Sequence, residues 1–482
     1  MILAIDIGTS TFKAAIFDME GRCLKQAAIP TPVSGGELDS GVWLAAFEAA
    51  VPLLGELGGL EALVISGNGP TLVPVTGNPE FSGGKFSVPA GKALLWLDRR
   101  AREESAKVSE LAGAYVDPSF FVPKALWIKN QDAGLYEKTR HFLFAPEYLV
   151  FALTGEARTV IPSQGFERWY WDAGMLEALG LESSKFPPFA VPGECIGTVS
   201  GEAASRFGFS PGLKVFAGGP DFFVSILGTG VTAAGQVCGR SGSSEGINLC
   251  IKERISDNRL MSYGHPIKPL WNLSGIISTT GKAVAWAREL LGMEGLPHES
   301  FYELAAKTRP GSQGLIFLPY LAGERAPLWD PAARGVFAGL GLDTGRAEMA
   351  RAAAEGICFA IRDVVSVMEE AGAPARNLRV SGGPGVSGFL NQLKADVSGR
   401  EVWSLAVRDA ELPGNACTGA AALGKYGSAG EAAAALIKTG RVFHPDTAKG
   451  PLYAECFARY RDLYRSLKGY FAAAAAERPS PP

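Results

Sequence analysis

The sequence contains few of the residues from which local metal and nucleophile sites are built. It has only four histidines and seven cysteines in 482 residues. Neither type forms a cluster, and no CxxC pair occurs. Scattered, unpaired cysteines are typical of reduced thiols that are buried as small apolar side chains. Local spacing therefore supports neither a zinc site nor a Cys/His nucleophile.

Long apolar runs and excess charge are also missing. No stretch of about 18 uninterrupted apolar residues occurs, and the N-terminus has no basic region followed by an apolar run and a cleavage site. The net charge of -3 gives no general attraction for nucleic acid or anionic membranes. We therefore expect a soluble, cytoplasmic protein that binds neither nucleic acid nor a membrane.

Apolar residues and glycine are abundant instead. The chain is 47% hydrophobic and has 60 glycines, and its length suggests about two to three domains with a large core. Glycines follow apolar segments such as 213–217 and 377–380, as expected where strands and helices alternate through short connections. Apolar residues at near-helical spacing predict a long amphipathic helix over 347–370.

The N-terminal segment predicts a hairpin that holds phosphate. An apolar strand is broken by Asp6-Ile7-Gly8-Thr9-Ser10, and a second apolar strand follows. Gly8 lets main-chain NH groups and the hydroxyls of Thr9 and Ser10 approach a phosphate, and Asp6 is suited to a hydrated Mg²⁺. Taken alone, these five residues more often form an ordinary β-hairpin turn.

A second segment, residues 236–251, again has the form strand, small-residue turn, strand. Two such hairpins, one near the start of each half, indicate a duplicated α/β architecture with a nucleotide between the halves. The repeated pattern is short and by itself weak evidence.

Three motifs compete for the mechanism. GxSxG at 242–246 would make Ser244 the nucleophile of a hydrolase, but the alternating residues after it predict a strand where that motif needs a helix. GxGxxG at 383–388 would indicate a dinucleotide-binding oxidoreductase, although Pro384 removes a phosphate donor. Phosphoryl transfer from ATP is the third. Since no GxxxxGK[ST] occurs, its phosphate site must be of the hairpin type.

Together these segments resemble the FGGY family of carbohydrate kinases, which share the duplicated fold of sugar kinases, actin and the heat-shock ATPases. The resemblance runs from Met1 to about Gly427, with the motifs in the family's order. It rests on IDIGTSTFKA, FVPKALWIKNQ, APEYLVFALTGE, AGGPDFFVSILGTG, LPYLAGERAPLWDPAARGVFAGL and VSGGPGVSGFLNQLKADVSGREV. It implies two actin-like (ribonuclease H-like) α/β domains, 1–236 and 237–482, with an ATP cleft between them and a frayed tail at 472–482.

The resemblance implies an ATP- and Mg²⁺-dependent kinase that transfers the γ-phosphate to a hydroxyl of a ketose or polyol. Asp221 would be the catalytic base, kept ionised at the start of a helix, whereas an isolated Asp there would be a helix cap. A non-sugar ATPase of the same fold stays open as an alternative. The expected partner is a small sugar or polyol, and a homodimer is the assembly to test.

The resemblance also implies the nucleotide and metal residues. Those for the metal are Asp6 and Asp221. Those for the nucleotide are Gly8, Thr9, Ser10, Gly242, Ser243, Gly382, Gly383, Asn391 and Gly419. Helix-on-sheet packing explains Gly419 equally well. Asn391 and Gln392 are either polar contacts or merely exposed, the orientation of Arg240 is open, and Lys13 is expected on a solvated strand face.

The identity of the sugar is less defined. The resemblance implies substrate contacts from Asn68, Gly69, Asp98, Arg99, Asp221 and Phe222. Gly69 and Pro70 stand where xylulose kinases of the family have the Met and His of GQMHG, so the xylulose contact is in doubt. Asp98 and Arg99 equally fit an exposed helix start. Phe222 predicts a more apolar, smaller pocket.

Overall fold

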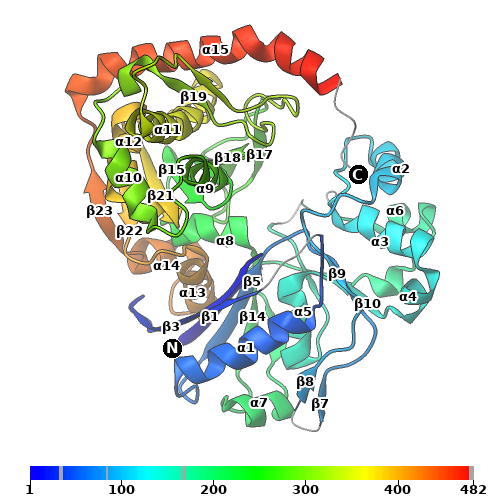
Figure 1. The fold of residues 1–482 in the computed structure, drawn as a ribbon. Helices are drawn as coiled ribbons and strands as arrows, with labels where there is room; N and C mark the ends of the chain where they lie inside the picture. Colours follow the sequence, from blue (N-terminus) through cyan, green and yellow to red (C-terminus); the bar gives the residue numbers. More distant parts are fainter. Residues whose placement is uncertain (32–35, 83–84, 164–165, 167–169, 477–482) are drawn as a thin grey trace. The chain divides into compact units, whose positions relative to one another are not determined.

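The computed structural model describes residues 1–31, 36–82, 85–163, 166 and 170–476 (Figure 1). The chain forms two compact units: unit 1 comprises Met1–Gly228 with Glu411–Ile437, and unit 2 comprises Thr229–Ala410 with the segment from Lys438 onward. This differs from the single division expected near residue 236, because the segment at 411–437 packs with the N-terminal part.

Unit 1 is built on a six-stranded sheet in the order β13-β14-β5-β1-β2-β3. β1 and β2 form the antiparallel hairpin expected at the N-terminus, and β1 pairs in parallel with β5, which pairs in parallel with β14. The strands are β1 (Ile2–Ile7), β2 (Thr11–Phe17), β3 (Cys23–Pro30), β5 (Ala62–Gly67), β13 (Cys195–Thr198) and β14 (Lys214–Pro220).

Helices cover both faces of this sheet, so β1 and β5 are buried along their whole length. Leu3 and Ile5 face the core that α1 and α5 complete, whereas Ile2 and Val64 face α13. The unit 1 helices are α1 (Gly41–Leu54), α2 (Arg102–Ala112), α3 (Phe121–Gln131), α4 (Ala133–Lys138), α5 (Ala145–Thr154), α6 (Ala173–Ala178), α7 (Gly201–Phe207), α8 (Asp221–Gly228), α13 (Glu411–Ala422), α14 (Ala429–Leu436) and the 3₁₀ turn η2 (Ser183–Lys185).

Short two-stranded ribbons carry the connections of unit 1 around this sheet. They pair β4 (Glu37–Leu38) with β9 (Ala93–Leu94), β6 (Val73–Val75) with β10 (His141–Leu143), β7 (Glu80–Ser82) with β8 (Lys85–Ser87), and β11 (Thr159–Val160) with β12 (Phe189–Ala190). β9 leads directly into the segment at 95–99, which contains the predicted substrate residues Asp98 and Arg99.

Unit 2 has a seven-stranded sheet in the order β17-β18-β16-β15-β21-β22-β23. β15 and β16 form the second predicted hairpin, and the strand after Ser244 contradicts a hydrolase nucleophile elbow. The strands are β15 (Gln236–Ser241), β16 (Glu245–Ile251), β17 (Met261–Gly264), β18 (Trp271–Ile277), β21 (Asn377–Gly382), β22 (Glu401–Leu405), β23 (Thr439–Phe443), and a separate pair β19 (Ile316–Leu318) and β20 (Val336–Ala338).

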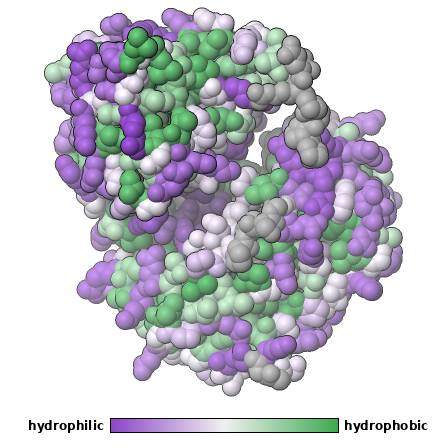
Figure 2. All heavy atoms as spheres, viewed as in Figure 1, coloured by the Kyte–Doolittle hydropathy of each residue, from purple (hydrophilic) through white to green (hydrophobic). Residues whose placement is uncertain are grey.

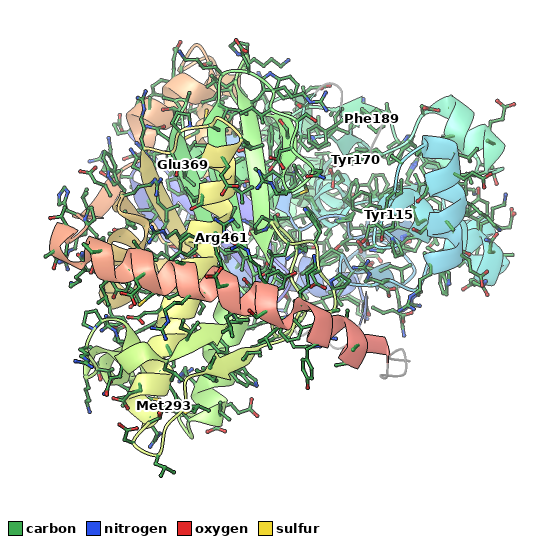
Figure 3. All side chains as sticks on the ribbon, turned by 90° about the horizontal axis from the view of Figure 1, so that it is seen from above. Tyr115, Tyr170, Phe189, Met293, Glu369 and Arg461 are labelled. Atoms are coloured by element: carbon green, nitrogen blue, oxygen red, sulfur yellow. The ribbon has the colours of Figure 1, made fainter. Side chains whose placement is uncertain are left out.

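The unit 2 helices confirm the long amphipathic helix expected at 347–370, since α11 spans Arg346–Glu370 and buries its apolar side in the core. Figure 3 shows Arg461 of α15 beside α11, where it pairs with Asp363 at 3.2 Å. The helices are α9 (Gly281–Leu290), α10 (His298–Ala306), α11, α12 (Gly388–Ser398), α15 (Gly450–Ala476) and the 3₁₀ turns η3 (Ser312–Gly314), η4 (Pro384–Val386) and η5 (Thr447–Lys449).

α15 continues to Ala476, so the first part of the tail expected to fray is helical, and residues 477–482 lie outside the described residues. All seven cysteines are free thiols; five are buried as expected, whereas Cys23 is half-buried and Cys195 is exposed. Hydrophilic and hydrophobic residues are interspersed on the face seen in Figure 2. Among the described helices, none is long and apolar enough to cross a membrane.

Candidate active site

The predicted phosphate turn joins β1 to β2 and is held by main-chain hydrogen bonds. The N–H of Gly8 donates to the carbonyl of Thr11 at 3.1 Å, and a Cβ on Gly8 would lie 2.7 Å from that same oxygen. A larger residue would therefore open the turn. Thr9 is partly exposed and Ser10 exposed, so both hydroxyls are accessible to a ligand.

Asp6 lies at the buried end of β1, next to this turn, and is only 2% exposed. Its Oδ1 accepts a hydrogen bond from Ser66 Oγ at 3.0 Å. Burial, followed by the negative charge of Glu411 and then that of Asp221, raises the pKa of Asp6 to about 8, although the facing Lys13 opposes the shift. Lys13 is half-buried rather than on an open strand face. A cation at Asp6 would relieve this concentration of negative charge.

Glu411 and Asn415, at the start of α13, belong to the same neighbourhood. The Asn415 side-chain N–H groups donate to the carbonyl of Ile5 and to Ser66 Oγ, both at 2.8 Å. Ser66 thus links Asn415 to the Asp6 carboxylate. Sequence reasoning missed these residues. No local motif marks them, because Asn415 and Ile5 are 410 residues apart in the chain.

Asp221 is the first residue of α8, as the sequence predicts, and follows β14 directly. Its carboxylate accepts the N–H of Phe222 at 2.5 Å, and the helix dipole favours negative charge at this position. The charge of Asp221 is one of the causes that raise the pKa of Asp6. The two predicted metal residues of unit 1 therefore share one electrostatic environment. Phe222 is half-buried beside Phe223.

Four of the six predicted substrate residues, Asn68, Gly69, Asp98 and Arg99, lie in two loops that are joined by hydrogen bonds. Asn68 follows β5 and donates through Nδ2 to the Ile7 carbonyl at 2.8 Å, and its Oδ1 accepts from Thr71 Oγ1 at 2.5 Å. In the second loop, the Trp96 N–H donates to Thr71 Oγ1 at 3.2 Å, and its indole N–H donates to Thr9 Oγ1 at 2.8 Å. No local sequence pattern indicated a role for Thr71 or Trp96.

Within the second loop, the predicted substrate residues Asp98 and Arg99 have different ion-pair partners. Arg100 Nε donates to both carboxylate oxygens of Asp98 at 3.0 and 2.9 Å, and Asp98 is buried. Arg99 pairs with Asp117 at 2.7 Å and stays largely exposed. Gly69 is exposed on the first loop. The structure brings Asn68 and Trp96 together through Thr71, and it directs Asp98 and Arg99 to different neighbours.

In unit 2, the second predicted phosphate turn is exposed at Gly242 and Ser243. Main-chain N–H groups of Thr280 and Lys282 at the start of α9 donate to the carbonyl of Ser243 at 3.1 and 3.2 Å. Arg240 is half-buried within the preceding strand, β15. These contacts fix the turn against one helix.

A pocket of about 270 Å³ lies at the end of β21 in unit 2. Gly382 lines it with φ +84°, and a Cβ there would collide with the carbonyl of Ser241. Asn391 donates through Nδ2 to the Gly385 carbonyl at 2.7 Å, whereas its Oδ1 and Ser381 Oγ are buried without a hydrogen-bond partner. The other lining residues are Val380, Gly385, Val386, Gly388, Ser404, Leu405, Arg408, Arg441 and Phe443.

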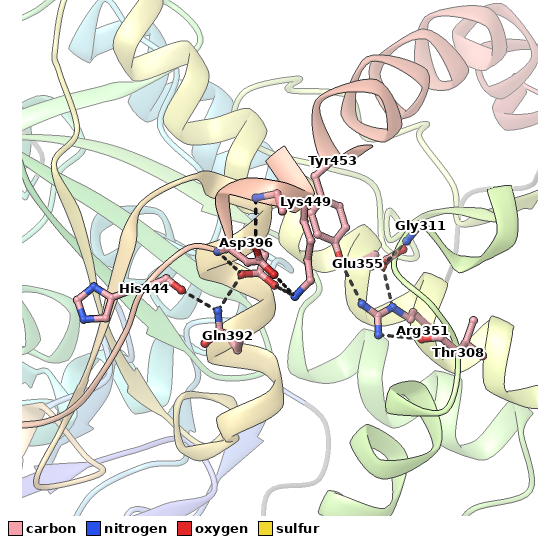
Figure 4. A network of polar contacts seen from close by, with 11 residues as sticks. Thr308, Gly311, Arg351, Glu355, Gln392, Asp396, His444, Lys449 and Tyr453 are labelled. Atoms are coloured by element: carbon pink, nitrogen blue, oxygen red, sulfur yellow. Dashed lines mark hydrogen bonds and ion pairs between the residues drawn. The ribbon is translucent and has the colours of Figure 1, made fainter. Parts of the chain in front are cut away.

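Gly383, Gln392 and Gly419, which the sequence predicted near the nucleoside, lie outside that lining. Gly383 faces the Arg408 guanidinium. Gln392 points away from the pocket and donates to Asp396 and to the carbonyl of His444, both at 2.8 Å (Figure 4). Gly419 belongs to α13 of unit 1, where a Cβ would press on Val64 and Ile2. Gly419 therefore packs a helix against the sheet, which is one of the two roles that the sequence left open for it.

The donor set suits Mg²⁺ bound with a nucleotide rather than a metal held by protein alone. In the part of the chain that the structure describes, no group of three or more His, Cys, Asp or Glu side chains is placed to hold a metal ion. Mg²⁺ usually takes one or two carboxylates, water and substrate phosphates. Asp6 with Asp221 fits that description. The unpartnered oxygens of Ser381 and Asn391 fit a nucleoside with polar edges.

Family models match both parts of the chain. The N-terminal domain model of the FGGY family of carbohydrate kinases matches residues 82–228, and the C-terminal domain model matches residues 241–423. Among curated relatives, a xylulose kinase from Staphylococcus epidermidis is 26% identical over 97% of both chains. The Escherichia coli K12 xylulose kinase is 27% identical over 83% of this chain and 86% of its own.

Solved structures agree with this fold. The xylulose kinase from Rhodospirillum rubrum has a TM-score of 0.80 and 26% identity, covering 98% of this chain and 99% of that one. The ligand-bound xylulose kinase from Lactobacillus acidophilus has a TM-score of 0.83 and 23% identity with the same coverage. The prediction of two actin-like α/β domains is confirmed.

Proposed function

We propose that this chain, which belongs to the FGGY family of carbohydrate kinases and phosphorylates a sugar with ATP and Mg²⁺, acts on a ketopentose of the xylulose type. Xylulose kinases aligned over nearly the whole chain support this choice. Gly69 and Pro70 replace the Met and His that are typical of xylulose kinases, so we expect other small ketoses and polyols to be accepted as well.

We assign Asp221 as the catalytic base. The observation that carries this assignment is the environment of Asp6: Asp221 at the start of α8 and Asp6 beside the phosphate turn are close enough for one charge to raise the pKa of the other. An ionised carboxylate at Asp221 would accept the proton of the sugar hydroxyl as it attacks the γ-phosphate. Phosphoryl transfer has a loose transition state, so orienting that hydroxyl matters more than base strength.

The remaining residues hold the nucleotide and the sugar. Mg²⁺, held by Asp6 and Asp221, would neutralise charge on the phosphates. The hydroxyls of Thr9 and Ser10 beside Gly8, and that of Ser243 in the Gly242 turn, would donate to phosphate oxygens. The pocket beside Gly382 would take adenosine, with Ser381 and Asn391 as hydrogen-bonding partners. The sugar would lie against the loops that contain Asn68, Gly69, Asp98 and Arg99, with Phe222 as an apolar wall.

Steady-state kinetics of Asp221→Asn tests the base. We expect sugar-dependent ADP release to fall by at least about a thousandfold, with nucleotide binding retained, because the amide keeps the shape but cannot accept the proton. The assay measures ADP release from ATP with D-xylulose and a panel of ketoses and polyols.

Three outcomes of that assay contradict parts of the proposal. Turnover near the wild-type rate in Asp221→Asn removes Asp221 from the mechanism. A slow ADP release by the wild type that no sugar stimulates supports a non-sugar ATPase instead. Stimulation by a polyol but not by D-xylulose would correct the substrate. The homodimer and the cytoplasmic location expected from the sequence stay predictions, which sedimentation velocity and cell fractionation measure.

A further inference from the structure

Lys124 of α3 is a lysine whose ammonium group is entirely enclosed by protein. The side chain is 0% exposed. Its Nζ donates to the carbonyl oxygens of Pro70 at 2.9 Å, Leu94 at 3.3 Å and Leu95 at 2.6 Å. An ammonium group has three donors, so all of them are used on main-chain acceptors and none is directed at solvent.

These three carbonyls come from the two loops that carry the proposed sugar contacts. Pro70 lies between Gly69 and Thr71 in the loop after β5, and Leu94 and Leu95 directly precede Trp96. One side chain therefore fixes the main chain of both loops at once. The aromatic packing of Phe121 on Phe144 and Trp171, with ring centroids 4.4 and 4.9 Å apart, anchors the start of α3.

Burial of the Lys124 ammonium group has a free-energy cost that an apolar side chain at the same position would not have. Burying an ammonium group is unfavourable unless it is fully hydrogen-bonded, and an apolar side chain of similar length would fill the same space without that penalty. Burial lowers the pKa of Lys124 to about 7, while the negative charges of Asp98 and Asp117 oppose that shift and the positive charge of Arg100 adds to it. The three carbonyl acceptors favour the charged ammonium form. Asp98 follows Trp96 in the second loop, so the ammonium also favours a negative charge in the proposed sugar site.

The same two loops are hydrogen-bonded to the phosphate turn, so a movement of the loops would also move the turn. Thr71 accepts the Trp96 N–H, and the Trp96 indole donates to Thr9 Oγ1 at 2.8 Å. Asn68 donates to the Ile7 carbonyl at 2.8 Å. Hydrogen bonds from Asn68 and Trp96 therefore join the two sugar loops to the phosphate turn, and Lys124 joins the two loops to each other.

We propose that Lys124 is a positioning residue for the sugar: it holds the loops at 68–71 and 94–98 in the geometry that binds substrate, without contacting the substrate itself. The inference rests on the proposed function, because it takes these loops as the sugar site. Lys124 lies within the segment FVPKALWIKNQ, and its sequence neighbours alone do not indicate this role.

Lys124→Met tests the proposal, with D-xylulose as the probe. Methionine keeps most of the volume but removes the Lys124 donor from all three carbonyls, of which those of Leu94 and Leu95 each keep one main-chain donor. We expect the KM for D-xylulose to rise at least about tenfold, with the Kd for ATP unchanged. Lys124→Gln keeps an amide donor and should give an intermediate KM. It also keeps the test valid if the methionine variant does not fold.

Lys129→Met is the matched control, since it makes the same change on the same helix. Lys129 Nζ donates to the carbonyls of Leu179 and Gly180, away from both sugar loops. We expect its KM for D-xylulose to stay at the wild-type value. Equal KM increases in the Lys124 and Lys129 variants would mean that α3 acts only through general stability.

The possible failures are distinguishable. If the wild type shows sugar-stimulated ADP release and folded Lys124→Met or Lys124→Gln has an unchanged KM, the positioning role is overturned and the kinase proposal stands. If kcat falls while KM stays constant, the role is also overturned, because loop position would then not govern sugar binding. If no sugar stimulates the wild type, both the proposed function and this inference fail.

Discussion

Glu147 of α5 is a buried carboxyl group with only part of its hydrogen-bonding capacity used. Its Oε1 accepts the N–H of Val160 at 2.9 Å, whereas Oε2 is buried without a hydrogen-bond partner. Burial raises the pKa of Glu147 from 4.5 to about 7. The folded protein therefore keeps this proton over a pH range in which the unfolded chain has already lost it.

The sign of the pH dependence follows from that difference. A raised pKa stabilises the fold fully below pH 4.5, and the contribution is lost as the pH rises through about 7. Glu147→Gln cannot titrate and lacks this loss. We expect the unfolding free energy of Glu147→Gln relative to wild type to increase by on the order of 2 kcal/mol between about pH 5 and pH 8.

Urea unfolding at several pH values measures this change. The exposed Glu177 provides the control, because Glu177→Gln should follow the wild-type pH dependence. Parallel curves for wild type and Glu147→Gln would show that the buried carboxyl group is already ionised across the whole range.

Asn391 and Gln392 are neighbouring amides of α12, and we expect only the first to affect the KM for ATP. Asn391 lines the pocket beside Gly382 with an unpartnered Oδ1, whereas Gln392 is bound to Asp396 and to the His444 carbonyl (Figure 4). We expect Asn391→Ala to raise the KM for ATP by about tenfold, the equivalent of one hydrogen bond. Gln392→Ala should leave the KM for ATP unchanged, and the reverse ranking in ADP-release kinetics would place adenosine elsewhere.

At the scale of secondary-structure elements, one buried ion pair attaches α12 to the β15–β16 hairpin. Lys394 Nζ lies 2.9 Å from Glu245 Oε1 and donates to Ser241 Oγ at 3.1 Å. Both charged side chains are at most 1% exposed. The helix that lines the pocket beside Gly382 is thereby fixed to the strands that flank the turn at Gly242 and Ser243.

Breaking this pair should be costly, and removing it completely should cost less. Lys394→Met leaves Glu245 charged and unpaired, so we expect a loss of about 3–5 kcal/mol in unfolding free energy. Lys394→Met with Glu245→Met should recover much of that loss. Lys449→Met, which breaks a partly exposed pair with Asp396, should cost at most about 1 kcal/mol. Urea unfolding that ranks the double variant below Lys394→Met would contradict the argument.

Local sequence patterns were sufficient to predict the two hairpins, α11 and the start of α8. Each hairpin has apolar strands on both sides of a small-residue turn, and α11 has apolar residues at helical spacing. These patterns are visible within a short stretch of sequence. Asp221 was placed at a helix start for the same reason. By contrast, nothing local distinguishes Lys124 from an exposed lysine of an amphipathic helix, because its burial depends on two loops that meet only after folding.

At the scale of the whole molecule, the chain returns to its first unit after completing most of its second. α13 and α14, within Glu411–Ile437, pack with the N-terminal residues. Gly419 allows α13 to approach β1 and β5 closely. A prediction from sequence alone divides such a chain once, because no change of composition marks the return. The carboxylate of Glu411 and the amide of Asn415 reach the site only through this return.

This connectivity makes the stability of β1 and β5 depend on a residue near the other end of the chain. Asn415 donates to the Ile5 carbonyl and to Ser66 Oγ from its buried amide, so Asn415→Ala leaves both without that donor. We expect a loss of about 1–3 kcal/mol, the cost of unsatisfied buried polar groups. It should be seen as faster amide hydrogen exchange in Ile2–Ile7 and Ala62–Gly67.

Thr418→Ala is the matched control, because the Thr418 hydroxyl donates only to the Gly414 carbonyl within its own helix at 3.0 Å. Exchange in β1 and β5 should then stay at the wild-type rate. The strands of unit 2, β15 and β21, should exchange at unchanged rates in both variants, because they belong to the other compact unit. Equal acceleration across both units in Asn415→Ala would show that the two units unfold together, and that α13 stabilises the whole chain rather than unit 1.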